Sequence, residues 1–268
     1  MSTYILPFWK KIGTSSSIIA KRVSEKLNLP TSHTGTLDPM AEGVVKIIVG
    51  EDSKNKENYI STNKTYQFKF LFGISTDTHD ALGMIDRISE SSSIDEEKLK
   101  IELNNFLGSY KQQYPNFSSK KINGRSLWEY ERQNFPVPEV FIEGEVIKII
   151  SSKLKVITKD KLLSKIFEQI NLIHGNFRQK DITISYQKAD LPNQFTFLEV
   201  EIEMTRGLYV RGLARDLGVR INMPCIILDL VRTKDGETGI QDCLNPEDYF
   251  QEEILKNQNF LFPDFKKL

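Results

Sequence analysis

The chain has 268 residues, of which 39% are apolar and 27% charged, so it can build a sizeable core and is not wholly disordered. Lys plus Arg and Asp plus Glu number 36 each, which excludes a basic footprint over the whole surface. No apolar stretch approaches the roughly 18 residues of a membrane span. Cys225 and Cys243 are the only cysteines, which suits a reducing compartment, and we expect a cytoplasmic protein.

The first predicted element is a helix over residues 15–27, because Ile19, Val23 and Leu27 repeat at four-residue spacing. Pro30 follows the end of this helix. Residues 44–49 form a short apolar run that predicts a buried strand. Residues 66–72 alternate between aromatic and other side chains, which predicts a strand with an aromatic face that begins at Tyr66.

The second half of the chain predicts a helix over residues 93–107, two strands over 140–158 and a helix over 161–173. Strict alternation over 198–204 predicts another strand, and Val210 opens a helix that we expect to end near Gly218. Strands and helices are mixed without a βα repeat, so we expect the α+β class.

Charge is unevenly distributed along the second half of the chain. Residues 111–132 and 206–234 form two basic segments, and residues 235–253 contain seven acidic side chains and no basic one. The ordinary interpretation of each segment is a solvated surface. The alternative is two anion-binding patches and an acidic tail.

Several kinds of chemistry lack their sequence signatures. The three histidines (His33, His79 and His174) lie far apart, and no zinc-ligand spacing occurs. There is no GxxxxGK[ST] phosphate loop, no GxGxxG and no GxSxG. These absences disfavour nucleotide-driven, nicotinamide-dependent and serine-hydrolase chemistry, and we expect no metal and no cofactor.

The most informative segment is residues 33–43, His-Thr-Gly-Thr-Leu-Asp-Pro-Met-Ala-Glu-Gly. Gly35 allows a tight turn, and Pro39 favours an extended conformation at Asp38. A short rigid loop would hold the Asp38 carboxylate at the mouth of a sheet, where it could act as a nucleophile, a general base or a metal ligand. An Asp-Pro pair alone is usually an ordinary turn.

The whole segment closely resembles the catalytic motif of the TruB family of tRNA pseudouridine-55 synthases. Further resemblances follow in order along the chain and cover residues 13–239. They are Lys-Thr-Tyr at 64–66, the segments 73–83 and 115–125, Arg-Gly-Leu-Tyr-Val-Arg at 206–211 and Leu-Val-Arg-Thr at 230–233. The resemblance implies the pseudouridine synthase fold, a mixed and mostly antiparallel sheet flanked by helices. It also implies isomerisation of uridine 55 in the T loop of tRNA, with the target base flipped out and neither metal nor cofactor.

The resemblance implies three catalytic residues. Asp38 would be the essential carboxylate, Tyr66 would stack under the target base, and Arg211 would pair with Asp38. Without the motifs, Tyr66 on an aromatic strand reads as core and Arg211 as a surface or phosphate-contacting cation. Whether Asp38 attacks the sugar or promotes an elimination is left open.

The resemblance also implies substrate-binding residues: His33, Tyr209, Leu230, Lys121 and Asp80. His33 would touch the RNA and help to expose the uridine, although a histidine in such a turn could equally be a local cap. Tyr209 and Leu230 would wall the base pocket, and Leu230 could equally be an ordinary core residue. We further expect phosphate contacts from two basic groups: Lys120, Lys121, Arg125 and Arg132, and Arg206, Arg215 and Arg220.

Besides single-residue departures within the motifs, the sequence differs from the family pattern in length at two places. Residues 160–181 add a helix and a short tail within a strand region, which we interpret as a surface insertion. Few residues follow Arg232, so we predict a catalytic domain over 1–234 and a short acidic tail over 235–268 without a complete PUA-type domain. A monomer is expected. Two alternatives remain: an RNA-binding or tRNA-folding helper with little or no catalysis, and the same isomerisation on another RNA stem-loop that resembles a T arm.

Overall fold

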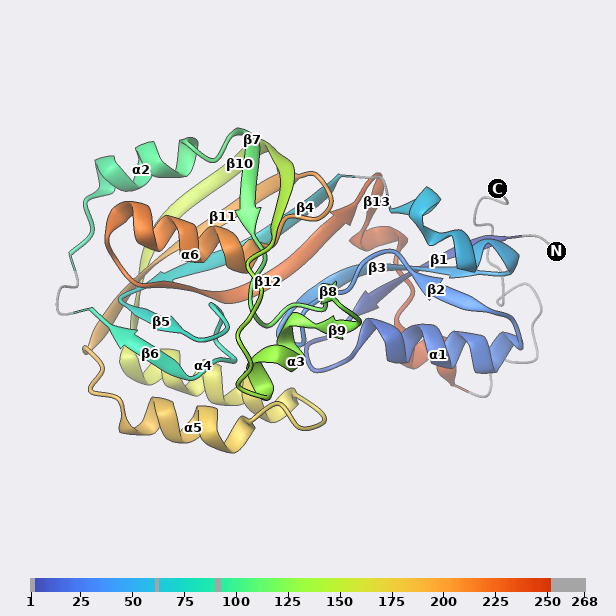
Figure 1. Ribbon diagram of the computed structural model, residues 1–268, viewed down its shortest axis with the longest axis horizontal. Coiled ribbons are helices and arrows are strands. Elements are labelled where there is room, and N and C mark those ends of the chain that lie inside the picture. Colours follow the sequence, from blue (N-terminus) through green and yellow to red (C-terminus); the bar gives the residue numbers. More distant parts are fainter. Residues whose placement is uncertain (1–2, 61–62, 90–92, 252–268) are drawn as a thin grey trace. The chain divides into compact units, whose positions relative to one another are not determined.

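The computed structural model describes residues 3–60, 63–89 and 93–251. The chain folds as two compact units: unit 1 comprises Met1–Tyr66 and Val231–Leu268, and unit 2 comprises Gln67–Leu230. The chain passes from unit 1 to unit 2 within strand β4 (Lys64–Phe72) and returns within strand β12 (Cys225–Asp235). Both strands therefore contribute residues to each unit (Figure 1).

Unit 1 is built on β3 (Glu42–Val49), which contains the apolar run predicted to be a strand. The strands β1 (Tyr4–Lys10) and β2 (Thr31–His33) pair with β3 in antiparallel fashion, and β12 pairs with its beginning in parallel. Helix α1 (Ser16–Leu27) contacts β2 and β3. The other elements are η1 (Glu51–Tyr59), β13 (Thr238–Gly239), η2 (Ile240–Asp242) and α7 (Pro246–Phe250).

The parallel pairing places Arg232 of β12 opposite Gly43 of β3. Gly43 has a φ of 125°, and a Cβ at this position would lie 2.2 Å from the carbonyl oxygen of Arg232. A side chain at residue 43 would therefore force the two strands apart. Glycine at this position lets β12 approach the loop that precedes β3.

The strands of the main sheet in unit 2 follow the order β12-β4-β11-β10-β7. Its further members are β7 (Gly108–Gln113), β10 (Phe141–Thr158) and β11 (Gln194–Met204), and β10 pairs antiparallel with both of the others. Two short hairpins pair β5 (Ile74–Thr76) with β6 (Ile85–Ile88), and β8 (Lys121–Ile122) with β9 (Arg125–Ser126). The helices are α2 (Glu96–Asn104), α3 (Leu127–Arg132), α4 (Lys159–Leu172), α5 (Gln179–Lys188) and α6 (Val210–Ile221).

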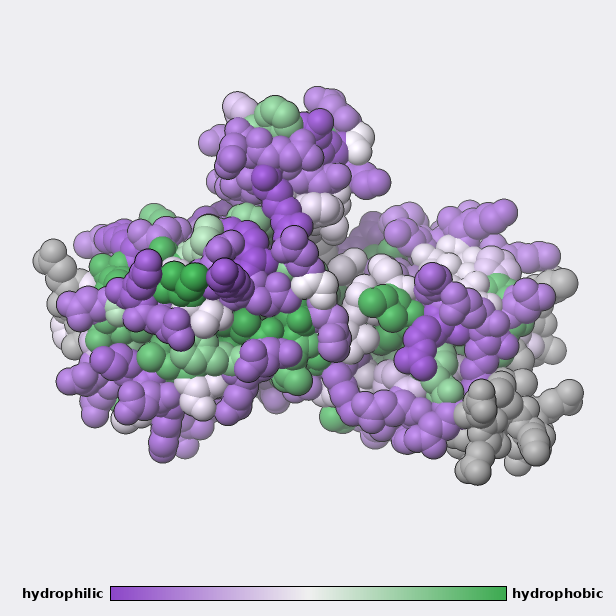
Figure 2. Space-filling model, turned by 90° about the horizontal axis from the view of Figure 1, so that it is seen from below, coloured by the Kyte–Doolittle hydropathy of each residue, from purple (hydrophilic) through white to green (hydrophobic). Residues whose placement is uncertain are grey.

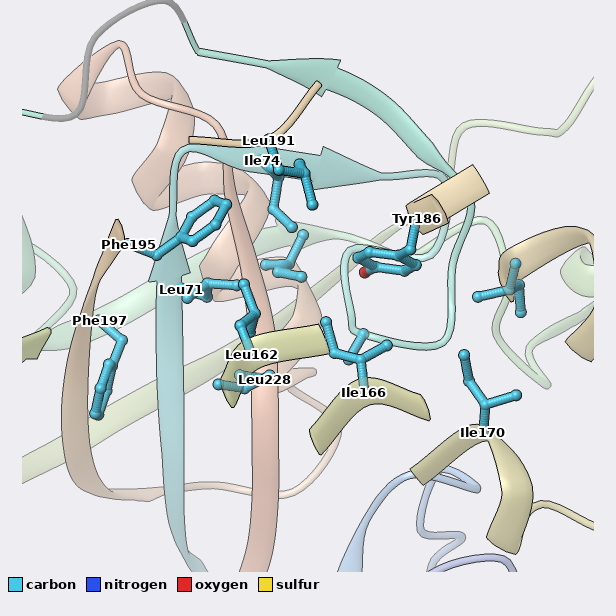
Figure 3. Close-up of a cluster of buried hydrophobic side chains, with 13 residues drawn as sticks. Leu71, Ile74, Leu162, Ile166, Ile170, Tyr186, Leu191, Phe195, Phe197 and Leu228 are labelled. Atoms are coloured by element: carbon cyan, nitrogen blue, oxygen red, sulfur yellow. The ribbon is translucent and has the colours of Figure 1, made fainter. Parts of the chain in front are cut away.

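The helices α4 and α5 form a hairpin between β10 and β11, and they build one layer of the unit 2 core. Figure 3 shows their apolar side chains facing those of the sheet strands. The cluster takes Leu162, Ile166 and Ile170 from α4, Ile182 and Tyr186 from α5, and Leu71, Phe195, Phe197 and Leu228 from the sheet. The interpretation of residues 160–181 as a surface insertion is therefore wrong, because removing them would expose this face.

The α+β class and the mixed sheet flanked by helices are confirmed. The first helix begins after Ser15, whose hydroxyl accepts a hydrogen bond from the Ser17 amide, as expected of an N-cap. The second predicted helix is shorter than 93–107, because Asp95 caps it and it ends at Asn104.

Two other predictions require correction. Two strands were predicted over 140–158, but residues 141–158 form one long strand, β10, with two register shifts within residues 146–151. Helix α6 continues through Gly218, where a Cβ would lie 2.9 Å from the carbonyl oxygen of Met223, and ends at Asn222 in the left-handed conformation. Gly218 therefore allows close packing and does not end the helix.

Candidate active site

Asp38 lies in unit 1 on the loop between β2 and β3, as the sequence predicts. Its carbonyl oxygen accepts a hydrogen bond from the Ala41 amide at 3.0 Å, which closes a turn with Pro39 at its second position. The carbonyl oxygen of Pro39 accepts a bond from the Gly13 amide at 2.9 Å. The Leu37 amide donates to the hydroxyl of Ser16 at 3.3 Å. The backbone on both sides of Asp38 is thus fixed by the first helix and the segment before it.

Lys10, at the end of β1, is the buried cation beneath this loop. Its Nζ donates to the carbonyl oxygens of Asp38 at 3.2 Å, Ala41 at 2.5 Å and Lys11 at 3.2 Å. Burial lowers the pKa of Lys10 to about 8, and the nearby Asp38 carboxylate opposes that shift. Lys10 therefore holds the turn at Asp38 through main-chain oxygens.

Arg232 holds the other end of the same loop. Its Nε donates to the carbonyl oxygen of Val44 at 2.6 Å, and its Nη2 donates to that of Gly35 at 3.2 Å. Its side chain also forms a hydrogen bond with Tyr66 of β4. Burial raises the pKa of Tyr66 and the Arg232 charge opposes this, so the phenol is neutral at neutral pH.

A second buried cluster in unit 1 surrounds Asp235. Its Oδ1 lies 3.3 Å from the Nζ of Lys46 and 3.2 Å from that of Lys64, and its Oδ2 accepts a hydrogen bond from the Thr34 hydroxyl at 3.0 Å. The Asp235 side chain is fully buried. Asp235 thus ties β3, β4 and β12 together next to the Asp38 loop, although the sequence suggested that it opens an acidic tail.

His33 is half-buried at the end of β2. Its Nε2 lies 3.4 Å from the hydroxyl of Ser17 in α1. Burial lowers the pKa of His33, and the positive charges of Lys56 and Arg232 contribute. The imidazole is therefore neutral at neutral pH, and it would offer hydrogen bonds to an RNA without adding charge.

Arg211 lies in unit 2 on α6 and is buried. Its Nη1 donates to the carbonyl oxygen of Thr78 at 3.2 Å, and its Nη2 donates to that of Phe117 at 3.2 Å. Its Nε lies 3.6 Å from Oδ2 of Asp80. Asp80 in turn accepts hydrogen bonds from the Thr78 hydroxyl at 2.7 Å and the Leu82 amide at 2.9 Å. Arg211 and Asp80 are thus two predicted site residues that the fold of unit 2 brings together.

The other predicted residues of unit 2 lie in different surroundings. Tyr209 precedes α6, and the buried side chain of Gln112 bonds both its amide, at 2.8 Å, and its carbonyl oxygen, at 3.1 Å. Leu230 is a buried residue of β12, and Lys121 is exposed on β8. Gln112 is therefore a positioning residue for Tyr209 that the sequence analysis missed.

In the predicted basic group of Arg206, Arg215 and Arg220, Arg206 is exposed before α6 and the other two lie on α6, engaged within the protein. Nε of Arg215 lies 2.7 Å from Asp216, and Arg220 lies over the Phe106 ring at 4.4 Å. In the other group, Arg125 lies over the Phe135 ring at 4.7 Å and Lys121 is exposed. Both groups therefore contain arginines that lie over aromatic rings, and Lys121 is an exposed cation on β8.

Arg232 lies within a motif that the sequence singled out but received no predicted role, and no role was predicted for Lys10, Lys46 or Asp235. The only signal was a charged residue within an otherwise apolar strand, as Lys46 is within β3. Across residues 3–60, 63–89 and 93–251, no helix is long and apolar enough to cross a membrane. The same ranges contain no group of three His, Cys, Asp or Glu side chains that could hold a metal ion.

Comparison with known families identifies one match. The model of the N-terminal domain of the TruB family pseudouridylate synthases matches residues 26–169, a range that contains both Asp38 and Tyr66. A curated relative from Aquifex aeolicus, named tRNA pseudouridine synthase B, is 30% identical over 245 residues, or 91% of this chain and 72% of the relative. A relative of the same name from Ureaplasma urealyticum is 30% identical over 90% of each chain.

Solved structures share the fold. The chain matches the crystal structure of a Cbf5–Nop10–Gar1 complex with a TM-score of 0.55 and 15% identity, over 97% of this chain and 56% of that one. It matches the structure of an H/ACA RNP bound to a substrate RNA containing 2'-deoxyuridine with a TM-score of 0.53 and 13% identity. The chain therefore spans little more than half the length of these solved chains, and at this identity the likeness concerns the fold alone.

Proposed function

The chain belongs to the TruB family of pseudouridylate synthases, and we propose that it isomerises uridine 55 in the T loop of tRNA to pseudouridine. Membership makes it an isomerase. The curated relatives carry the name tRNA pseudouridine synthase B, which supports tRNA as the substrate class. The position of the target uridine rests on the resemblance of residues 33–43 to the family's catalytic motif.

One observation supports the proposal most. Asp38 lies within the matched segment, on a loop whose main chain is bonded at both ends by the buried cations Lys10 and Arg232. A catalytic carboxylate must keep its place while the base is detached and turned, and rigid positioning of a reacting group lowers the barrier. Hydrogen bonds donated by these two cations to main-chain carbonyl oxygens provide that rigidity.

The reaction breaks the bond between C1' of the ribose and N1 of uracil and forms a bond between C1' and C5. The proton on C5 is lost and N1 gains one, so atoms and electrons balance without an oxidant or reductant. We propose that Asp38 drives the cleavage, either by attack on the sugar or by promoting elimination. Tyr66 would stack under the base, and its neutral hydroxyl, bonded to Arg232, could donate a proton but would be a poor base.

The roles of the unit 2 residues stay predictions from the sequence. Arg211 would supply the cation that pairs with Asp38 when RNA is bound, because a guanidinium is always charged and can bond a carboxylate twice. His33, Tyr209 and Leu230 would contact the flipped base or fill the space that it leaves in the RNA. Lys121 and Asp80 complete the predicted contacts. We expect no cofactor and no metal.

The test is an assay on an unmodified tRNA transcript without added metal cofactor or nucleotide, with the modified position mapped by chemical labelling and reverse transcription. We expect pseudouridine at position 55, and none in a matched transcript with cytidine at 55. Product at a different position, or only on a stem-loop that resembles a T arm, would contradict the assignment of the substrate. Tight tRNA binding without product would contradict catalysis and favour a tRNA-folding helper.

A further inference from the structure

The hairpin of α4 and α5 contacts the segment that holds Arg211. Tyr186 and Ile182 of α5 pack in the same buried cluster as Ala81, which follows Asp80 directly. The β5–β6 hairpin, which contains this turn, lies next to α5 (Figure 1). The turn over residues 77–81 therefore packs on the same buried cluster as α5.

Arg178, at the start of α5, makes two contacts beyond its own hairpin. Its Nη1 lies 2.5 Å from Oδ2 of Asp77, and its Nη2 donates to Oδ1 of Asp77 at 3.3 Å. Its guanidinium also lies 4.6 Å from the centre of the Phe117 ring. A bidentate ion pair and stacking on an aromatic face are the two geometries that suit arginine and not lysine.

The backbone at Arg178 is unusual as well. Its φ is 62°, in the left-handed region that residues other than glycine rarely adopt. Gly175, three residues earlier in the same loop, also has a positive φ, but glycine adopts this conformation without strain and arginine does not. The strained backbone directs the Arg178 side chain toward Asp77 and Phe117, away from the outer surface of the hairpin.

The contacts of Arg178 converge on those of Arg211. Arg211 donates to the carbonyl oxygens of Thr78 and Phe117, each at 3.2 Å. Arg178 bonds the residue before Thr78 and covers the ring of Phe117. The two segments that fix the Arg211 guanidinium are thus joined to each other by the side chain of Arg178 at the start of α5.

We infer that Arg178 is a positioning residue that fixes the orientation of Arg211. This inference rests on the proposed catalytic role of Arg211. Without the guanidinium of Arg178, the turn at Asp77 loses a direct link to the loop at Phe117, and the two acceptors of Arg211 are held less firmly relative to each other. Since Arg178 does not itself meet the reacting atoms, its loss lowers the rate of isomerisation and leaves tRNA affinity unchanged.

The variant Arg178→Gln tests the inference against a matched control, Lys180→Gln. Lys180 is an exposed cation on α5, so its substitution removes the same charge without touching Asp77 or Phe117. Figure 2, seen from below the view of Figure 1, shows hydrophilic residues above and below a band of hydrophobic ones in its left half. The measurements are the single-turnover rate of pseudouridine formation, the Kd for tRNA and the melting temperature.

We expect Arg178→Gln to lower the single-turnover rate roughly tenfold, within the range by which residues modulate a site through another group. The Kd should stay within about twofold and Lys180→Gln should match the wild type. Arg178→Lys should keep the charge but lose most of the rate, because it cannot form the paired bonds. The double variant Arg178→Gln/Arg211→Lys should be no slower than Arg211→Lys alone, which marks action through Arg211.

Three results would overturn the inference. Equal rates for Arg178→Gln and Lys180→Gln would show that Arg178 has no catalytic consequence. A weaker Kd at an unchanged rate would make Arg178 an RNA contact, and full additivity with Arg211→Lys would make it independent of Arg211. Should Arg178→Gln not fold, Phe117→Leu removes the stacked ring while keeping the carbonyl, with the same expectation. A wild type without product on tRNA would instead contradict the proposed function itself.

Discussion

Two parts of the molecule position charged groups in opposite ways. In unit 1, buried cations approach the main chain around a carboxylate, as Lys10 and Arg232 do around Asp38. In unit 2, main-chain oxygens and a carboxylate surround a cation, as those of Thr78, Phe117 and Asp80 do around Arg211. The loop that carries Asp38 is thus held through its backbone, whereas Arg211 is held through its side chain.

The largest expected effect on stability comes from removing a buried countercharge in unit 1. Asp235 and Asp229 each meet two lysines, but the Asp235 side chain is fully buried while that of Asp229 is 19% exposed. We expect Asp235→Asn to lower the free energy of unfolding by about 3–5 kcal/mol, because the buried Lys46 and Lys64 lose the negative charge that faces them. Asp229→Asn, whose lysines reach water, should cost about 1 kcal/mol.

Urea unfolding of the two variants at pH 7 measures this difference. Equal losses for Asp235→Asn and Asp229→Asn would show that burial does not set the value of these ion pairs. The lysine pair around Asp235 and the lysine pair around Asp229 would then contribute equally to stability.

The next largest effect concerns Tyr66. Tyr66→Phe keeps the buried ring but removes the hydroxyl that bonds Arg232. We expect the single-turnover rate to fall about 100-fold, the lower end of what a positioned proton donor contributes. The free energy of unfolding should fall by only about 1–2 kcal/mol. A normal rate in Tyr66→Phe would reduce Tyr66 to a stacking and packing residue.

The smallest expected effect is the pH dependence of stability that His79 causes in unit 2. Burial and the charges of Arg215 and Arg211 lower the pKa of His79 to about 4. Because the folded form binds this proton less readily than the unfolded chain, its contribution is present above pH 6.5 and is lost as the pH falls toward 4. We expect about 1–2 kcal/mol of stability to be lost between pH 7 and pH 5 on this account.

The check is urea unfolding of His79→Asn at both pH values. Asparagine tolerates the left-handed backbone at this position, where φ is 59°. The variant should lose less stability than the wild type on acidification. An identical pH dependence in both proteins would mean that His79 titrates in the folded state as it does in the unfolded chain.

The sequence predicts the regular parts of the fold because their patterns are local. The spacing of Ile19, Val23 and Leu27 predicts α1, and the alternation after Tyr66 predicts β4. Helix α5 was missed because its middle carries the β-branched residues Ile182, Thr183 and Ile184, which disfavour helix on their own. Burial of Ile182 and Tyr186 against the sheet overrides that preference, and such tertiary packing leaves no local signal.

The residues of the candidate site also fall into two groups, those that a local motif predicts and those that only the fold reveals. Asp38, Tyr66 and Arg211 could be predicted because each lies within a motif of the family. The residues that hold them could not, since Lys10 bonds carbonyl oxygens across the fold and Arg178 reaches Asp77 from 101 positions away. Every residue has a main-chain carbonyl oxygen whatever its side chain, so a sequence does not reveal which of these oxygens a cation will bond.

The central claim is that Asp38 is the essential carboxylate of a tRNA uridine isomerase. Its most direct test is the single-turnover formation of pseudouridine by Asp38→Asn, beside Asp160→Asn, which removes an exposed carboxylate at the start of α4. We predict no product from Asp38→Asn, with tRNA binding and folding retained, and wild-type rates from Asp160→Asn. Full activity in a folded Asp38→Asn would contradict the account.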